Sequence, residues 1–132
     1  MQRKDFEYFV GTAWQKGGDS TGFNSKDVIK IIKKNLSNKL TLIKGDNVEI
    51  LPGLTVFTGS KHTYESQYLL VGHDSDKVII ASDNSWLYYN LTSLLPIPIT
   101  FDKVAYIENL KRMNSMVKNV DLILPGHDLL VF

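Results

Sequence analysis

Three side chains able to bind a metal, His62, Asp83 and His127, each stand a few residues after an apolar stretch typical of a β-strand. Sites in open α/β sheets lie at the carboxyl ends of strands, where the loops of neighbouring strands converge. The three side chains could therefore meet at one edge of a sheet. Two imidazoles and a carboxylate suit a first-row divalent metal ion, and the carboxylate could bridge two ions. The chain has no cysteine, so any metal site must use nitrogen and oxygen ligands.

The spacing alone leaves a simpler interpretation open, in which none of these residues binds a metal. The intervals from His62 to Asp83 and from Asp83 to His127 are too long to fix a geometry. On that interpretation His62 is a polar loop residue, Asp83 caps a turn, and His127 belongs to a Pro-Gly turn. Ser66 and Asp128 could orient a ligating imidazole from outside the ligand set, or could hydrogen-bond to the local backbone instead.

The strands that would position these residues are predicted from hydrophobic periodicity. Short apolar or alternating runs, separated by turn residues, are typical of β-strands. A hairpin loop is expected at residues 72–76, and His73 in that loop is expected to be exposed to solvent. The runs predict six strands: Leu40 to Ile43, Val48 to Leu51, Leu54 to Phe57, Gln67 to Val71, Val78 to Ala81 and Val120 to Leu124.

Apolar residues at spacings of three and four predict two longer helices, Lys26 to Leu36 and Asp102 to Val117. Thr100 is expected to cap the second helix, and a shorter amphipathic helical run is expected between Arg3 and Trp14. The lysines of the first helix are interpreted as a solvated face. Together the elements predict an α/β fold, a sheet with helices packed on one face, in a single domain over residues 1–132.

The composition and charge of the chain argue against two classes of binding partner, nucleic acid and membrane. The chain has 132 residues, of which 43% are hydrophobic and 22% are charged, as is typical of one globular domain. Fifteen Lys and Arg against fourteen Asp and Glu leave a net charge of +1, which is too little for the basic field of a nucleic-acid-binding protein. No segment resembles a secretory signal or approaches the ~20 apolar residues of a membrane span. We therefore expect a cytoplasmic protein with neither nucleic acid nor membrane as its partner.

Four short segments carry a resemblance to a known family. They are Pro52-Gly53-Leu54, Thr58-Gly59-Ser60-Lys61-His62-Thr63, Ile80-Ala81-Ser82-Asp83 and Leu124-Pro125-Gly126-His127-Asp128. In order and spacing they resemble the later motifs of the metallo-β-lactamase-fold hydrolases, in particular the N-acyl homoserine lactonase-like branch. The resemblance is strongest over residues 46–132 and implies the C-terminal half of an αββα sandwich. It also implies that His62, Asp83 and His127 are ligands of zinc or another first-row divalent metal, with Asp83 bridging two ions.

The sequence departs from the family pattern at two places. The family's earlier His-x-His-x-Asp-His motif, which supplies most of the ligands, does not occur in this sequence. Trp86 stands three residues after Asp83, where the lactonase branch has a tyrosine that assists the substrate carbonyl. The resemblance thus implies a hydrolase that opens a lactone or ester by attack of metal-bound hydroxide, with half of its site absent. No catalytic residue, and no particular substrate, is assigned from the sequence.

Half of a sandwich leaves one apolar sheet face without a partner. Contiguous apolar patches of more than a few hundred Å² are rarely left exposed, so this face should be covered. A second copy of the chain, related by a twofold axis, is the simplest candidate and predicts a homodimer. The other candidate is a partner chain that supplies the missing N-terminal half. The alternative function is a non-catalytic half-domain that dimerises and at most binds a metal ion.

Overall fold

A computed structural model describes residues 1–16, 24–73 and 76–131 of the chain. The chain forms two compact units, Met1–Lys44 and Gly45–Phe132, so the single domain expected over residues 1–132 stays a prediction. Residues 74 and 75 of the expected hairpin loop lie outside the described residues. Within the described ranges, no helix has both the length and the apolar character needed to cross a lipid bilayer.

The first unit is helical. Its elements are α1 (Arg3–Glu7), the π-helix η1 (Tyr8–Thr12), α2 (Ala13–Lys16) and α3 (Ser25–Leu36). These elements confirm the helical runs expected in this part of the chain. The side chain of Asn24 accepts a hydrogen bond from the amide of Lys26 at 2.9 Å and so caps α3. Val28 of α3 is buried, whereas the four lysines of this helix are exposed, which confirms the expected solvated face.

The strand expected from Leu40 to Ile43 is not present. Ile43 makes one isolated parallel bridge with Gln2, in which the amide of Arg3 donates to the Ile43 carbonyl at 2.7 Å. Because α1 begins at Arg3, the extended partner is too short for a ladder. The prediction was wrong because an apolar run becomes a strand only where a second extended segment pairs with it.

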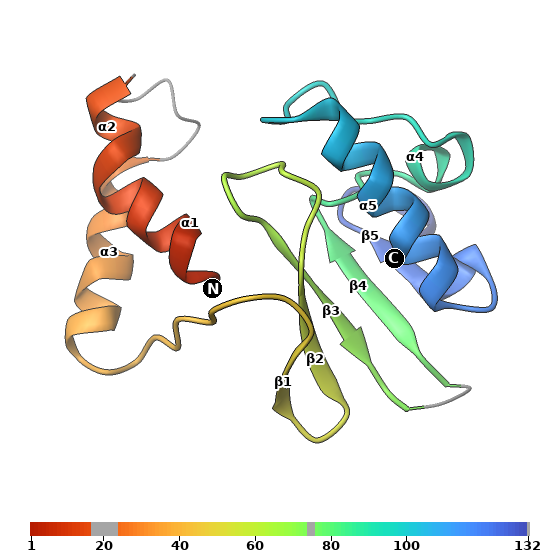
Figure 1. Cartoon of the computed structure of the whole chain (residues 1–132), viewed down its shortest axis with the longest axis horizontal. Helices are drawn as coiled ribbons and strands as arrows, with labels where there is room; N and C mark the ends of the chain where they lie inside the picture. The colour runs from red at the N-terminus through yellow and green to blue at the C-terminus, as the bar shows by residue number, and fades with distance from the viewer. Residues whose placement is uncertain (17–23, 74–75, 132) are drawn as a thin grey trace. The chain divides into compact units, whose positions relative to one another are not determined.

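The second unit is built on one mixed five-stranded sheet (Figure 1). β1 to β4 form an antiparallel meander, and β5 runs parallel to β4. Four of the predicted strands are confirmed to within one residue, and β4 is a central strand as expected. In spatial order the strands are β1 (Val48–Leu51), β2 (Leu54–Thr58), β3 (Gln67–Val71), β4 (Val78–Ser82) and β5 (Ile123–Pro125).

The last strand is shorter than predicted. The segment Val120–Leu122 forms a 3-10 turn, and β5 begins only at Ile123. Asn119 precedes this turn, and its side chain accepts a hydrogen bond from the amide of Asp121 at 3.3 Å. A side-chain cap satisfies the backbone locally and so competes with pairing in a sheet. The predicted strand therefore loses its first three residues.

Two helices, α4 (Tyr88–Ser93) and α5 (Lys103–Met116), complete the second unit. Asp102 caps α5, because its carboxylate accepts hydrogen bonds from two amides of the first turn at 2.9 and 3.0 Å. The predicted cap, Thr100, donates its hydroxyl to the carbonyl of Lys61 at 2.9 Å instead. That prediction was wrong because a carboxylate next to the helix also interacts favourably with the helix dipole. α4 was not predicted, since six residues are too few to show a helical period.

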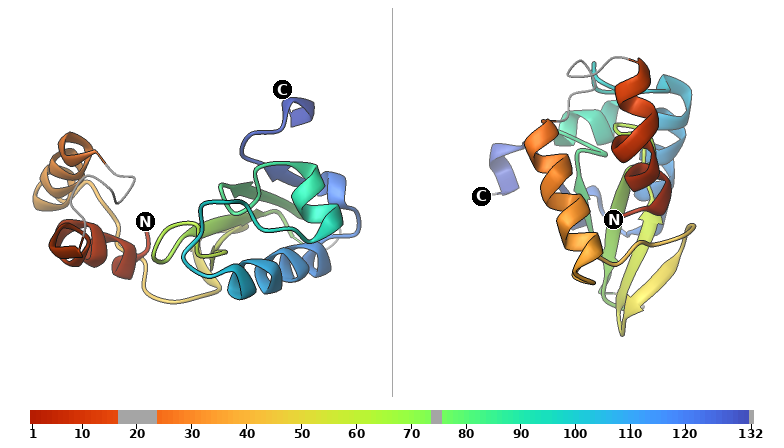
Figure 2. Two further views of the ribbon diagram at one scale, coloured as in Figure 1. Left: turned by 90° about the horizontal axis from the view of Figure 1, so that it is seen from above. Right: turned by 90° about the vertical axis from the view of Figure 1, so that its left-hand side faces the viewer.

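The hydrophobic core of this unit lies between α5 and one face of the sheet, along which α5 runs (Figure 2). Phe57 and Tyr68 stack across β2 and β3 with ring centroids 5.4 Å apart. A mixed α/β sheet with helices on one face confirms the predicted fold class. The other core residues are at most 1% exposed and are Ile79, Ala81, Leu91, Ile97, Tyr106, Leu110, Met113 and Ile123.

The opposite face of the sheet is also apolar. Successive side chains of a strand point to opposite faces, so Ile80 lies on the other side from Ile79. Ile80 is 41% exposed and Val71, on the same face, is 37% exposed. Leu69 and Leu124, which pair with Ile80 on either side, are half-buried. This face is the one that the half-sandwich interpretation expects a partner to cover.

A clamp between Asp46 and Arg112 ties the start of the second unit to α5. The guanidinium makes two hydrogen bonds to the carboxylate, at 2.7 and 3.2 Å, and lies 4.9 Å from the ring centroid of Phe57. The amide of Thr58 donates to the same carboxylate at 2.8 Å. Burial disfavours the charged form of Asp46, but the hydrogen bonds from Arg112 and Thr58 outweigh it and lower its pKa.

We expect Asp46→Asn to lower the free energy of unfolding by about 1 kcal/mol at pH 7, the scale of a solvent-exposed ion pair. A lowered native pKa contributes stability above the unfolded pKa, and this contribution is lost as pH falls through the native value. The difference between wild type and variant should therefore be constant above about pH 5 and shrink below about pH 4. Urea unfolding at pH 7, 5 and 3 measures it.

The matched control is Asp27→Asn, which breaks the 2.8 Å contact between Asp27 and Lys30 on the surface of α3. Its effect should stay below about 0.5 kcal/mol at every pH. An Asp46→Asn variant that lost as much stability at pH 3 as at pH 7 would contradict the role given to the charge.

Candidate metal centre

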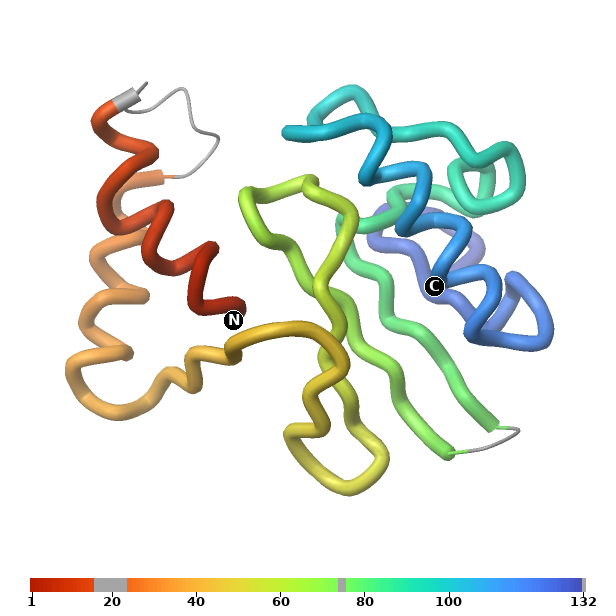
Figure 3. The backbone as a smooth tube through the Cα atoms, in the orientation of Figure 1, coloured from red at the N-terminus to blue at the C-terminus, as the bar shows by residue number. Residues whose placement is uncertain are grey.

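The three strands that precede the candidate residues run in one direction. β2 and β4 are separated by the antiparallel β3, and β5 is parallel to β4 (Figure 3). Their carboxyl ends therefore lie at one edge of the sheet. His62 leaves the end of β2, Asp83 the end of β4, and His127 the end of β5. This is the edge at which sites of α/β sheets assemble.

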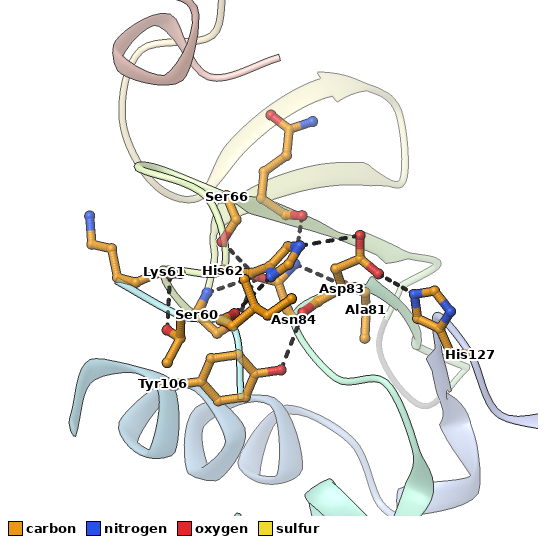
Figure 4. Close-up of polar contacts among 12 residues, drawn as sticks. Ser60, Lys61, His62, Ser66, Ala81, Asp83, Asn84, Tyr106 and His127 are labelled. Atoms are coloured by element: carbon orange, nitrogen blue, oxygen red, sulfur yellow. Dashed lines mark hydrogen bonds and ion pairs between the residues drawn. The ribbon is translucent and has the colours of Figure 1, made fainter. Parts of the chain in front are cut away.

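Asp83 lies between the two histidines (Figure 4). One carboxylate oxygen is 2.7 Å from Nε2 of His127, and the other is 3.6 Å from Nε2 of His62. The structure therefore brings together the three side chains that the sequence singled out. The His127 side chain is 57% exposed and that of His62 is 20% exposed, so the cluster opens to solvent on the His127 side.

A tight backbone approach sets the distance between Asp83 and His127. Ser82, at the end of β4, has a left-handed φ of 50° and pairs with Pro125. A Cβ on Gly126 would lie 2.8 Å from the carbonyl carbon of Ser82, closer than real Cβ atoms come to backbone. Glycine at this position therefore lets the end of β5 stay against β4, which places His127 beside the carboxylate.

A carbonyl oxygen orients His62. Nδ1 of His62 is 3.0 Å from the carbonyl of Ile99, which can only accept, so Nδ1 carries a proton and donates. In a neutral ring Nε2 then presents a lone pair toward the Asp83 carboxylate. A lone pair facing a carboxylate is unfavourable unless a proton or a cation lies between them. The amide of Phe101 donates to the Lys61 carbonyl at 2.8 Å and holds the two segments together.

Trp86 forms an apolar wall beside both imidazoles. Its ring centroid is 6.3 Å from that of His62 and 5.3 Å from that of His127, in edge-on arrangements. The indole nitrogen is buried and has no hydrogen-bond partner among the described residues. Trp86 thus excludes water from one side of the cluster, and it has no hydroxyl to offer a substrate carbonyl.

Ser66 and Asp128 lie near the cluster but bond elsewhere. The hydroxyl of Ser66 donates to the side-chain oxygen of Asn84 at 2.8 Å. Asp128 accepts hydrogen bonds from the amides of Tyr88 at 2.8 Å and Leu130 at 3.0 Å. Asp128 thus makes the backbone hydrogen bonds that were one of its two expected roles, whereas Ser66 bonds to a side chain, which was neither of the roles expected for it.

The sequence did not single out two groups that support the cluster. Tyr106 of α5 donates its hydroxyl to the backbone carbonyl of Asp83 at 3.2 Å, and burial raises the pKa of this phenol, so it remains a donor. The carbonyl of Ile99, which orients His62, is the other. These contacts join residues 23 and 37 positions apart, so no short spacing could reveal them. The only signal was a tyrosine on the apolar side of a predicted helix.

The donor types suit a metal ion, but the cluster does not close around one. Among the residues that the structure describes, no group of three or more His, Cys, Asp or Glu side chains is placed to hold an ion. Two ligands of a tetrahedral zinc ion, each ~2.0–2.1 Å from it, are about 3.3 Å apart. The 3.6 Å between His62 and Asp83 is close to this distance, whereas the 2.7 Å between His127 and Asp83 would have to widen. Each imidazole faces its own carboxylate oxygen.

Comparison with known proteins rests on solved structures, because no family model and no curated protein matches the sequence. An N-acyl homoserine lactone hydrolase, solved with the product N-hexanoyl-L-homoserine at its catalytic metal center, matches with a TM-score of 0.56 and 27% identity. A mutant of the AiiA protein of B. thuringiensis with N-decanoyl-L-homoserine at its active site matches equally well. In both cases the match covers 67% of this chain and 36% of the other chain.

A probable metal-dependent hydrolase from Staphylococcus aureus has the same fold, with a TM-score of 0.58. At 20% identity, over 70% of this chain and 33% of that chain, this match supports the fold alone. All three proteins are much longer than the part they share with this chain, so the chain spans about a third of their length. The chain therefore has the α/β fold of the metallo-β-lactamase-fold hydrolases over that third, and resembles their N-acyl homoserine lactonase branch.

Proposed function

We propose that this chain supplies one part of the active site of a metal-dependent hydrolase that opens a lactone or a related ester. The observation that carries the proposal is the placement of Asp83 between two imidazoles, with the His62 ring fixed so that Nε2 faces the carboxylate. The likeness to lactone hydrolases at 27% identity supports the substrate class.

In this proposal Asp83 bridges two divalent ions, zinc or another first-row metal, and each histidine binds one of them. When bound, the ions supply Lewis acidity toward the substrate carbonyl. His62 contributes a preset ligand, because the Ile99 carbonyl already fixes its tautomer. Trp86 contributes an apolar wall rather than a hydrogen bond. Electrophilic assistance must then come from a group outside these residues.

The remaining ligands must come from another polypeptide segment. A catalytic zinc ion commonly has three protein ligands, and two ions cannot share the three side chains of this cluster and reach that number. We propose that a second copy of the chain supplies them, packed against the apolar sheet face of Val71 and Ile80. The other candidate, a chain that carries the missing half of the fold, predicts a monomer that acquires activity only when mixed with that chain.

A second candidate function is a non-catalytic half-domain that dimerises and at most binds an ion. What favours it is that the described side chains form no complete metal-binding group. The two candidates differ in one measurable respect, since only the first predicts hydrolysis.

Titration calorimetry with Zn²⁺ or Co²⁺ tests the metal site. We expect Asp83→Asn and His127→Ala to weaken binding by at least roughly tenfold, because each removes a ligand. His73→Ala is the matched control, since His73 is an exposed histidine outside the cluster. Hydrolysis of N-hexanoyl-homoserine lactone, followed by acid release, should require the added metal and be lost in Asp83→Asn. Equal metal affinity in wild type and Asp83→Asn would rule out the proposed site.

Light scattering at micromolar concentration tests the partner. We expect a mass twice the 15.0 kDa of the chain. Ile80→Lys places a charge on the exposed sheet face and should give a folded monomer, because an unpaired charge is costly to bury in an interface. Leu129→Lys changes a residue that is 88% exposed and lies outside the sheet, and it should leave the dimer intact. A wild-type mass of one chain would refute the homodimer.

A further inference from the structure

Asn84, the residue after Asp83, is the most completely hydrogen-bonded side chain near the cluster. It is 1% exposed. Its oxygen accepts from the amide of Ser60 at 2.7 Å, from the Ser60 hydroxyl at 3.0 Å and from the Ser66 hydroxyl at 2.8 Å. Its nitrogen donates to the carbonyls of Gln67 and Ala81, both at 2.8 Å. Both amide hydrogens are therefore used, and the oxygen is fully occupied (Figure 4).

These bonds link two parts of the chain that carry the candidate ligands. Ser60 and Ser66 lie on either side of His62 in the connection between β2 and β3, whereas Ala81 belongs to β4. Asn84 itself is covalently joined to Asp83. One amide group thus closes the loop of His62 at both of its ends and fixes that loop to the backbone that bears Asp83.

Gly59 shows how closely the loop packs on this amide. A Cβ at position 59 would lie 1.9 Å from the side-chain oxygen of Asn84 and 2.6 Å from the Ser66 hydroxyl. The amide of Gly59 also donates to the carbonyl of Ser66 at 2.6 Å, which draws the two ends of the loop together. No side chain fits between the loop and Asn84, so a shift of the amide would shift the loop.

We infer that Asn84 is a positioning residue of the candidate metal centre, which sets the separation of His62 and Asp83 before an ion binds. The inference rests on the proposed function for the identity of the ligands. Sites are effective when neighbouring hydrogen bonds fix their ligands in advance. Asn84 acts on the backbone of the loop that carries His62. The His62 ring itself is hydrogen-bonded to the Ile99 carbonyl, which fixes the tautomer but belongs to a separate segment.

The chemistry of the amide explains why asparagine is required. Aspartate would keep the acceptor but would turn carboxylate oxygen toward the carbonyls of Gln67 and Ala81, where two donors are needed. Alanine would leave two buried serine hydroxyls and the same two carbonyls without this partner. Only an amide of this length offers one acceptor and two donors at these positions.

The test compares Asn84→Ala and Asn84→Asp with the control Asn114→Ala. Asn114 donates to the Leu91 carbonyl at 2.9 Å and joins α5 to α4, so its loss removes a side-chain hydrogen bond from outside the cluster. Three properties are measured: the affinity for Co²⁺, hydrogen exchange of the Ser60 amide, and the nuclear Overhauser effect between the rings of His62 and Trp86. Thermal unfolding of each variant shows how far the fold itself is weakened.

We expect both Asn84 variants to bind Co²⁺ roughly 10- to 100-fold more weakly, as is typical when a group that orients a ligand is removed. The Ser60 amide should exchange faster and the ring contact should weaken, while Asn114→Ala changes neither. Should the Asn84 variants fail to fold, Ser66→Ala removes one of the three donors and should show the same changes to a smaller extent. Unchanged Co²⁺ affinity in folded Asn84→Ala, or an unchanged ring contact, would overturn the inference.

The outcomes separate this inference from the proposed function. Wild-type protein that binds no Co²⁺, combined with loss of the ring contact and of Ser60 protection in Asn84→Ala, would refute the metal site and leave Asn84 as the group that places His62. Measurable Co²⁺ binding that is equally tight in wild type and in Asn84→Ala would refute the inference and leave the metal site standing.

Discussion

The common direction of β2, β4 and β5 is the constraint on which the rest of the site depends. Antiparallel pairing of β3 with both β2 and β4, followed by one parallel pair, puts three carboxyl ends at one edge. The parallel pair requires a long crossover, and α4 and α5 supply it. Because these helices also cover one face of the sheet, the same crossover builds the core and delivers His127 to Asp83.

The polar contacts beside the cluster follow from the burial of Asn84, Ser60 and Ser66 at this edge. Backbone groups at the strand ends have no further strand to pair with, and they must find other partners. Asn84 supplies them for Gln67 and Ala81, and the hydroxyl of Tyr106 supplies one for Asp83. The Asp83 carboxylate is thereby left to interact with Nε2 of His62 and Nε2 of His127.

Sequence patterns predicted the sheet well where pairing is local. β1 to β4 are joined by short connections, and their apolar runs match the structure to within one residue. The run from Leu40 failed because it has only Gln2 to pair with, and the run from Val120 was shortened by the Asn119 cap. In both places the outcome depended on the partners of the backbone, which hydrophobicity does not encode.

The candidate residues of the site could be predicted because each follows a strand. The contacts that hold them could not, since Ile99, Tyr106 and Asn84 reach their partners across loops and leave no periodic trace. The roles of Ser66 and Asp128 could not be predicted for the same reason. A residue type and its position in a loop do not determine which of several nearby acceptors a hydroxyl or carboxylate meets.

The clamp of Asp46 and the pairing of β5 have a consequence for the order of folding. The contact of Asp83 with His127 spans 44 residues, and that of Asp46 with Arg112 spans 66. Closing such long loops costs more conformational entropy, and is therefore slower, than forming the hairpins of β1 to β4. The antiparallel meander alone therefore lacks His127, which follows β5. Because His127 joins the cluster only when β5 pairs with β4, the site is complete only in the fully folded second unit.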